Sequence, residues 1–128
     1  MNLTQVLFSF SGRIRRSTFW LYGLGLGVVL GIIIAVGIML ASNGGAMAIV
    51  GSVIAFAAYV VAIWAGLALQ VKRWHDRDKA WVWIFIAFIP LVGAIWALVE
   101  TGFLDGTPGP NKFGPSPKGL TGPAVAAT

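Results

Sequence analysis

Three long apolar stretches constrain this chain more than any other feature. They cover about residues 17–41, 48–70 and 81–103, and the only charged residue within them is Glu100. Each exceeds the roughly 20 residues that an α-helix needs to cross a hydrocarbon core of about 30 Å. Backbone amides in lipid must bond within their own segment, so helices are expected rather than a barrel. The sequence therefore predicts an all-α integral membrane protein with three transmembrane helices.

Composition narrows the class further. Only 10% of the 128 residues are charged and 58% are hydrophobic, whereas a soluble domain usually carries about 25% charged residues. The length allows one domain, which we place at residues 1–118, with a flexible C-terminal tail at residues 119–128. The net charge of +5 comes largely from basic residues at the ends of apolar stretches. We therefore expect lipid headgroups rather than nucleic acid as the partner.

Shorter segments flank and join these stretches. Residues 1–12 carry four apolar side chains at helical spacing, which predicts a short interfacial helix leading into the first span. The uncharged turn at residues 42–45 contains Asn-Gly-Gly and joins the first two spans as an antiparallel hairpin. Five of the six prolines follow residue 103, in a Pro/Gly-rich tail that cannot continue a helix.

Pro90 and Gly93 interrupt the third stretch at its centre. Proline removes one backbone hydrogen bond, and a membrane helix tolerates the resulting kink when neighbouring helices compensate. The first interpretation is a kinked third span that carries the tail to the opposite side of the membrane. The alternative is a re-entrant hairpin that returns the tail, in which case Glu100 would pair with Arg16 or Arg73.

Basic residues cluster before the first span and again at residues 71–80, whereas the first turn is uncharged. By the positive-inside rule, the N-terminus and the 71–80 loop face the cytoplasm. Interfacial aromatic residues are expected at the same level: Phe19, Trp20, Tyr22, Trp74, Trp81 and Trp83. We call these basic and aromatic residues the collar. Its cations are expected to contact anionic lipid headgroups or a membrane partner, and they are Arg13, Arg15, Arg16, Lys72, Arg73, Arg77 and Lys79.

Small residues form a ridge on each of the first two spans. In lipid, close backbone approach decides whether helices associate, and small side chains allow it. We interpret the two ridges as packing against each other within the chain. The alternative is a surface for a second copy of the chain or for another membrane protein. The ridges consist of Gly23, Gly27, Gly31 and Ala35, and of Gly51, Ala55, Ala58, Ala62 and Gly66.

His75, Asp76 and Asp78 are the only ionisable cluster with catalytic character. One histidine and two aspartates within four residues are a small inventory for a metal site, which typically needs three oriented protein ligands. The neighbouring cations favour ion pairing, so we predict no metal and no cofactor. The turn-rich motif at residues 106–118 is expected to be ordered, and its distinctive residues are Gly109, Asn111, Phe113, Gly114 and Pro115.

Three motifs resemble one known family, the DUF805 proteins. Phe10-Ser11-Gly12-Arg13, with Arg16 and Phe19-Trp20, is similar to the opening of that family. Residues 72–76, Lys-Arg-Trp-His-Asp, resemble its Arg-Arg-Leu-His-Asp segment with two replacements. Residues 106–115 resemble its Gly-x-x-Gly-x-Asn-x-aromatic-Gly-Pro tail, although Ser116 stands where an aspartate is common. The resemblance implies a small bacterial inner-membrane protein and supplies no biochemical role.

The specific residues of the chain are packing glycines, interfacial aromatics and cations suited to headgroups. They favour a non-enzymatic inner-membrane protein, an accessory subunit or scaffold, whose collar contacts anionic lipid or a membrane partner. One alternative is a transporter or channel component that acts as an oligomer, because three apolar helices offer no polar pathway of their own. A second alternative is a membrane enzyme that uses His75 and Asp76.

Overall fold

The computed structural model describes residues 2–119, so residues 120–128 of the tail predicted to be flexible lie outside the described residues. The elements in chain order are α1 (Leu3–Phe8), α2 (Arg16–Ala41), α3 (Gly45–Asp76), the 3-10 helix η1 (Trp81–Phe88), α4 (Val92–Leu98) and the short π-helix η2 (Val99–Phe103). Over the described residues the regular structure is helical, apart from one isolated β-bridge in the tail. The all-α prediction is confirmed.

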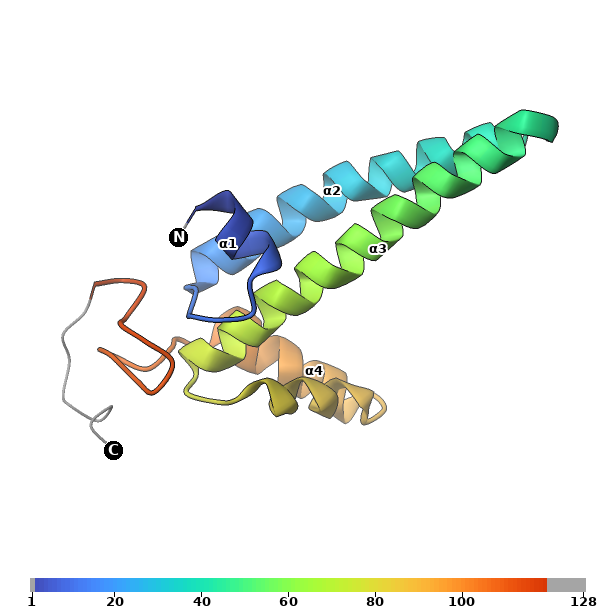
Figure 1. Cartoon of the computed structure of the whole chain (residues 1–128). Coiled ribbons are helices and arrows are strands. Elements are labelled where there is room, and N and C mark those ends of the chain that lie inside the picture. The colour runs from blue at the N-terminus through green and yellow to red at the C-terminus, as the bar shows by residue number, and fades with distance from the viewer. Residues whose placement is uncertain (1, 120–128) are drawn as a thin grey trace.

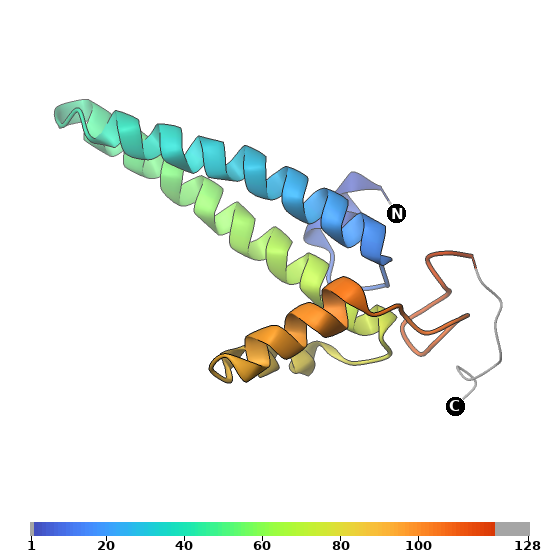
Figure 2. The ribbon, with the colours of Figure 1, turned by 180° about the vertical axis from the view of Figure 1, so that it is seen from behind.

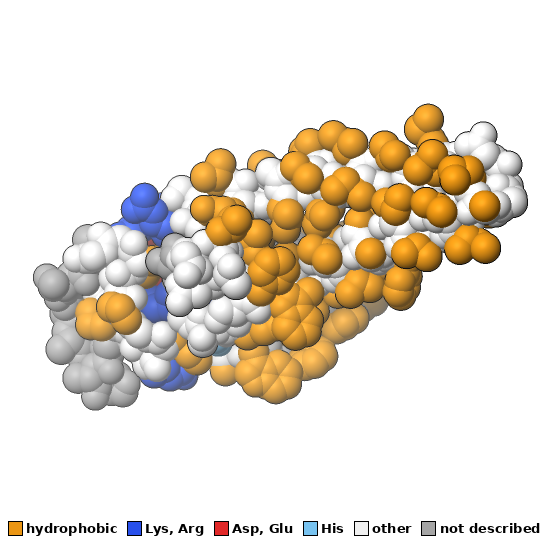
Figure 3. All heavy atoms as spheres, turned by 45° about the horizontal axis from the view of Figure 1, so that its top comes forward, with side chains coloured by type: hydrophobic (Ala, Val, Ile, Leu, Met, Phe, Trp, Pro, Cys, Tyr) orange, Lys and Arg blue, Asp and Glu red, His pale blue; other side chains and the backbone are white. Residues whose placement is uncertain are grey.

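The two longest helices, α2 and α3, form an antiparallel hairpin that extends away from the rest of the molecule (Figure 1). At 1.5 Å per residue, the 26 residues of α2 span about 39 Å and the 32 residues of α3 span about 48 Å. Both exceed a hydrocarbon core of about 30 Å. Only 11% of the most apolar part of each helix is buried within the chain. Apolar side chains therefore cover the outside of this hairpin, as lipid requires (Figure 3).

We call the outer part of this hairpin, residues 23–66, the arm. Its helices are in close backbone contact at Gly37 and Gly51. A Cβ at position 51 would overlap the Gly37 carbonyl oxygen, and a Cβ at position 37 would lie 2.7 Å from the Gly51 carbonyl oxygen. Nothing lies within 4 Å of a Cβ built at Gly27 or Gly31. Since Gly37 follows Gly31 by six residues, about 240° around the helix, the two glycines face different directions.

The predicted ridges are therefore only partly in contact. On α2, Gly23 is half-buried near Leu69, whereas Gly27, Gly31 and Ala35 are exposed, so the prediction that this ridge packs on α3 is wrong for those three. On α3 the prediction is closer to the structure. Gly51 and Ala58 are buried, Ala55 and Ala62 are half-buried, and Gly66 is exposed.

The third apolar stretch forms a re-entrant hairpin and not a kinked span. The structure therefore agrees with the alternative prediction and not with the first. The chain reverses at Pro90 and Leu91, and Leu91 has a φ of +63°. α4 then returns along η1, in contact so close that a Cβ at Gly93 would overlap the Ile86 carbonyl oxygen. At about 2.0 Å per residue, the eight residues of η1 reach about 16 Å, roughly half of the hydrocarbon core.

The predicted loop at residues 71–80 is mostly helical. α3 continues to Asp76, and only residues 77–80 connect it to η1. The charge density of this segment suggested a water-exposed loop, but Lys72 and Arg73 are completely buried and bonded to other parts of the chain. With those charges satisfied internally, nothing in the sequence interrupts the helix before Asp78, which has a φ of +61°.

The hairpin returns the chain to the end of the molecule at which α1 lies, and the tail follows there (Figures 1 and 2). The short N-terminal helix is present as predicted: Asn2 caps α1 by exchanging hydrogen bonds with Gln5. It buries Val6 and Leu7 in a small core with Leu69. We call this part of the molecule, residues 2–22, 67–80 and 97–119, the charged end. Its cytoplasmic location stays a prediction.

Candidate functional site

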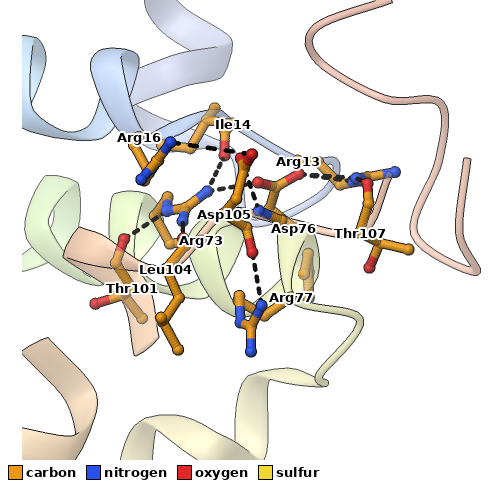
Figure 4. A network of polar contacts seen from close by, with 12 residues as sticks. Arg13, Ile14, Arg16, Arg73, Asp76, Arg77, Thr101, Leu104, Asp105 and Thr107 are labelled. Atoms are coloured by element: carbon orange, nitrogen blue, oxygen red, sulfur yellow. Dashed lines mark hydrogen bonds and ion pairs between the residues drawn. The ribbon is translucent and has the colours of Figure 1, made fainter. Parts of the chain in front are cut away.

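A buried ion-pair network occupies the charged end, with Asp76 at its centre (Figure 4). Arg13 Nε and Nη2 each lie 2.9 Å from Asp76 Oδ1. Arg73 Nη1 lies 2.5 Å from Asp76 Oδ2, one turn earlier on α3. All three side chains are at most 3% exposed. Buried charges are tolerated only when they are paired and hydrogen-bonded, so this geometry explains how α3 carries charge inside the molecule.

Arg73 connects three segments through backbone carbonyl groups. Its Nη1 donates to Ile14, its Nε to Thr101 and its Nη2 to Leu104. The lead into α2, the end of the re-entrant hairpin and the start of the tail therefore meet at one guanidinium. A planar group with five donors in fixed directions suits this task, which a lysine could not reproduce.

Arg13 binds backbone carbonyl groups of the tail in the same way. Its Nη2 donates to the Thr107 carbonyl oxygen at 2.8 Å, and its Nη1 donates to those of Gly109 and Gly114 at 2.8 and 3.2 Å. Gly106 lies against the Asp76 carboxylate so tightly that a Cβ there would overlap it. We define the Asp76 network as Arg13, Arg73, Asp76 and the six carbonyl groups that the two arginines bind.

The predicted tail motif folds onto this network. Asn111 Nδ2 donates to the His75 carbonyl oxygen at 2.9 Å, and its Oδ1 accepts from Phe113 N. The Phe113 ring stacks on the His75 ring with centroids 4.1 Å apart and planes 6° from parallel. Gly109 and Gly114 supply carbonyl oxygens to Arg13 as described, and Pro115 is exposed. The motif is ordered, as expected, and it caps the C-terminal end of α3.

Lys72 and His75 hold the N-terminal segment. Lys72 Nζ donates to the carbonyl oxygens of Gln5, at 3.1 Å, and Ser9. His75 Nδ1 donates to the Gly12 carbonyl oxygen at 2.9 Å. Both side chains lie on the last turns of α3, and both point to residues that precede α2. Their bonds explain why such a short helix as α1 is fixed in place.

Glu100 forms a second pair site beside the first. Its two oxygens accept hydrogen bonds from Arg77 Nε at 2.8 Å and from Lys79 Nζ at 2.9 Å. The re-entrant hairpin therefore brings Glu100 to the cations, as the sequence suggested for that case. The prediction that Glu100 pairs with Arg16 or Arg73 is wrong. Arg73 belongs to the Asp76 network, and Arg16 donates to the Phe103 carbonyl oxygen.

The predicted aromatic belt is divided between surface and interior. Trp20 donates its indole N–H to the Gly102 carbonyl oxygen at 2.7 Å, while Trp81 and Trp83 are exposed. Trp74 is completely buried, so its prediction as an interfacial residue is wrong. The continuation of α3 directs it toward the hairpin, where it stacks on Trp83 with ring centroids 5.9 Å apart.

Several charged residues lie outside the two pair sites. Asp78 is exposed and forms no ion pair among the described residues, so the structure does not bring it into the cluster with Asp76. Asp105 lies 2.6 Å from Lys118 Nζ, and this hydrogen bond holds the pKa of the Asp105 carboxyl below its usual value. Within residues 2–119, Arg15 has no anionic partner and Lys112 only faces the Phe113 ring.

A pocket of about 370 Å³ opens beside the unpaired Arg15. Arg15, Thr18 and Tyr22 form one wall of this pocket, and the tail residues Phe113 and Ser116 form another. The hydroxyl groups of Thr18 and Tyr22 have no hydrogen-bond partner among the described residues. The pocket therefore combines one unpaired cation with two hydroxyl groups that lack partners among the described residues, at the level of the collar. Residues 2–119 contain no group of three His, Asp or Glu side chains placed to share a metal ion.

Sequence reasoning missed the residues that complete the site through their backbone. Ile14, Thr101 and Leu104 contribute carbonyl oxygens, which any residue type supplies. Gly106 carried a signal in the tail motif, but nothing in the sequence pointed to contact with Asp76. Gly106 and Asp76 are 30 residues apart along the chain.

Comparison with known proteins gives a consistent result. The family model described as "Protein of unknown function (DUF805)" matches residues 7–115. "Inner membrane protein YhaI" of Escherichia coli (strain K12) is 31% identical over 111 residues, covering 85% of this chain and 86% of YhaI. "Inner membrane protein YhaH" of the same strain is 31% identical over 114 residues, covering 85% and 87%. "Uncharacterized protein YiiR" is 29% identical over 138 residues, covering 89% of each chain. No solved structure matches.

Proposed function

Because this chain belongs to the DUF805 family and is an inner-membrane protein, we propose that it is a non-enzymatic scaffold whose collar binds anionic lipid headgroups. The carrying observation is the closure of the Asp76 network. Every guanidinium nitrogen of Arg13 and Arg73 donates to an acceptor within the chain. Such a network maintains a shape, and the Asp76 carboxylate, next to His75 in the sequence, is engaged by both arginines. This supports an architectural role over an enzymatic one.

The headgroup contact is assigned to the pocket beside Arg15. Most cations of the collar have internal partners, so they have little capacity left for a ligand. Arg15 is exposed, unpaired among the described residues and flanked by the hydroxyl groups of Thr18 and Tyr22. A cation near the membrane surface contributes about 1 kcal/mol to the binding of anionic lipid, and hydroxyl groups add donors for phosphate oxygens.

Lipid selection measures this proposal directly. The full chain is reconstituted in nanodiscs of mixed phosphatidylglycerol and phosphatidylcholine, and co-purified lipid is counted by native mass spectrometry. Arg15→Gln is expected to lower the enrichment of phosphatidylglycerol about fivefold, the equivalent of about 1 kcal/mol. Lys112→Gln is the matched control, because it removes an exposed cation of the same end that does not line the pocket.

Two results would count against the proposal. An unchanged enrichment in Arg15→Gln would remove the headgroup assignment, and an equal loss in Lys112→Gln would reduce it to non-specific attraction. The same spectra report whether a second copy of the chain or another membrane protein is retained. A stoichiometric protein partner with no selected lipid would favour the accessory-subunit form of the scaffold hypothesis.

A further inference from the structure

An apolar groove of about 880 Å³ lies between α3 and the re-entrant hairpin and shares no lining residue with the Arg15 pocket. Trp64, Gly66 and Leu67 of α3 form one wall, and Trp81, Phe85 and Phe88 of η1 form the other. The hairpin diverges from α3 as it leaves the charged end (Figure 1). In a bilayer, a groove with these apolar walls opens into hydrocarbon.

The length of the groove matches one leaflet. His75 is the eleventh residue after Trp64 along α3, a distance of about 16 Å at 1.5 Å per residue. The eight residues of η1 cover a similar depth, as described above. Half of a hydrocarbon core of about 30 Å is about 15 Å. The groove therefore extends over about the depth of one leaflet, from His75 at the charged end to Trp64.

Unpaired polar atoms lie toward one end of the groove only. His75 is 7% exposed and lines the groove, and its Nδ1 is used by the Gly12 carbonyl oxygen. Its Nε2 has no hydrogen-bond partner among the described residues, and neither has the side-chain amide of Gln70. Beyond Gln70 the walls are apolar, since the indole N–H of Trp64 is bonded to the Phe8 carbonyl oxygen. The groove is thus polar at the interface and apolar in depth.

We propose that this groove is a binding site for one acyl chain of a phospholipid in the leaflet of the charged end. The acyl chain lies between α3 and η1, and its ester carbonyl accepts a hydrogen bond from the Gln70 amide. His75 Nε2 accepts from a hydroxyl group or an ordered water at the same level. This site goes beyond the proposed headgroup contact, because it recognises the apolar part of a lipid and needs no negative charge.

Gly66 offers a way to fill the groove without disturbing the fold. A Cβ at this position meets nothing within 4 Å, and the same holds for Gly27 on the arm, which does not line the groove. Gly66→Phe places a ring in the space proposed for the acyl chain. Gly27→Phe adds the same ring to a lipid-facing position elsewhere and is the matched control. Both variants are checked for unchanged thermal unfolding before use.

The experiment uses a zwitterionic probe, so that its outcome is independent of the Arg15 pocket. The full chain is reconstituted in phosphatidylcholine that carries a photoactivatable diazirine near the end of one acyl chain, and cross-linked peptides are mapped. Cross-links are expected in residues 64–71 and 81–88 of the wild type and of Gly27→Phe. Gly66→Phe is expected to reduce them at least fivefold.

Other outcomes would overturn the proposal. Cross-links spread evenly over the outer faces of α2 and α3 would show bulk lipid contact without a site. Undiminished labelling in Gly66→Phe would place the acyl chain elsewhere. Native mass spectrometry of protein from native membranes adds one more criterion: retention of a non-phospholipid amphiphile, or of a second protein that blocks labelling, would replace the acyl chain as occupant.

Discussion

The charged end and the arm are built from the same two helices but are held together by different forces. At the charged end, three side chains of the Asp76 network are at most 3% exposed and are bonded to segments from all parts of the chain. In the arm, the two backbones touch where Gly37 meets Gly51, and large apolar side chains face outward. Apolar side chains gain little by packing against each other when the surrounding lipid is equally apolar. Close backbone contact is therefore what holds the two helices together.

This difference teaches where each kind of residue is indispensable. The charged end depends on particular polar side chains, because a buried charge without its partner is costly. The arm depends on the absence of a side chain at two positions and tolerates many others. Substitutions that are conservative by composition should therefore have very unequal effects in the two regions.

The largest effect is expected for Asp76→Asn at the charged end. The change keeps the shape but removes the carboxylate from two buried guanidinium groups, and breaking such a pair costs about 3–5 kcal/mol. Thermal or denaturant unfolding in detergent measures the loss. Asp78→Asn is the control and should have little effect, since that side chain is exposed and unpaired among the described residues. Equal stability of the two variants would contradict the central role of Asp76.

Glu100→Gln should follow, at about 1.5–3 kcal/mol, which is typical of a hydrogen bond to a charged group. The amide oxygen can replace only one of the two acceptors that Arg77 and Lys79 now use. Hydrogen exchange of the re-entrant hairpin measures the local loss of stability, and faster exchange is expected in residues 92–103. If exchange accelerated in the arm as much as in the hairpin, the two regions would not be separate.

Gly51→Ala tests the arm and should cost about 1–3 kcal/mol as an overpacked contact. The added methyl group would overlap the Gly37 carbonyl oxygen, so the two helices must separate. Distances between spin labels at residues 42 and 70 report whether the tip moves while the charged end stays intact. Gly31→Ala, with open space at its Cβ, should be neutral or slightly stabilising. A destabilised Gly31→Ala would show that the exposed ridge is covered.

The smallest effect is expected at the edge of the charged end. Lys118→Gln removes a partly exposed pair with Asp105, which is worth about 0–1 kcal/mol. Because the pairing lowers the pKa of Asp105, its contribution is present above the ordinary aspartate pKa of about 3.9 and is lost as the pH falls through the lowered value. NMR titration of Asp105 in the wild type and in Lys118→Gln measures the shift, which should become smaller in the variant, where the Gly106 N–H and Arg16 still lower the pKa.

Much of the fold could be predicted because lipid imposes a simple rule on sequence. The extent of α2 and the start of α3 follow from apolar runs and from the Asn-Gly-Gly turn between them, whereas α3 continues six residues past its apolar run, to Asp76. The re-entrant hairpin was one of two solutions for Pro90 and Gly93, and local sequence did not decide between them. The decision depends on contacts far along the chain, namely Glu100 with Arg77 and Trp20 with Gly102.

The candidate site was predicted in composition more than in arrangement. Ion pairing was predicted for Asp76, and it pairs with Arg13 and Arg73. The cations were expected to face lipid headgroups or a membrane partner, whereas the partners of Arg13 and Arg73 are mainly carbonyl oxygens. Backbone acceptors leave no trace in the identity of the residues that carry them. The small-residue ridge of α2 misled the prediction in another way. Gly37, which makes the contact with α3, lies outside the four-residue repeat of that ridge.

The connections of Arg13 also set an order of assembly. Its carbonyl partners Thr107, Gly109 and Gly114 come 94, 96 and 101 residues later in the chain, and therefore leave the ribosome after the segments that form the helices. Asp76 is synthesised before them, but the guanidinium donors that the tail carbonyls accept from need water or headgroup oxygens until the tail folds back. A chain that stops before the tail therefore lacks three acceptors of Arg13.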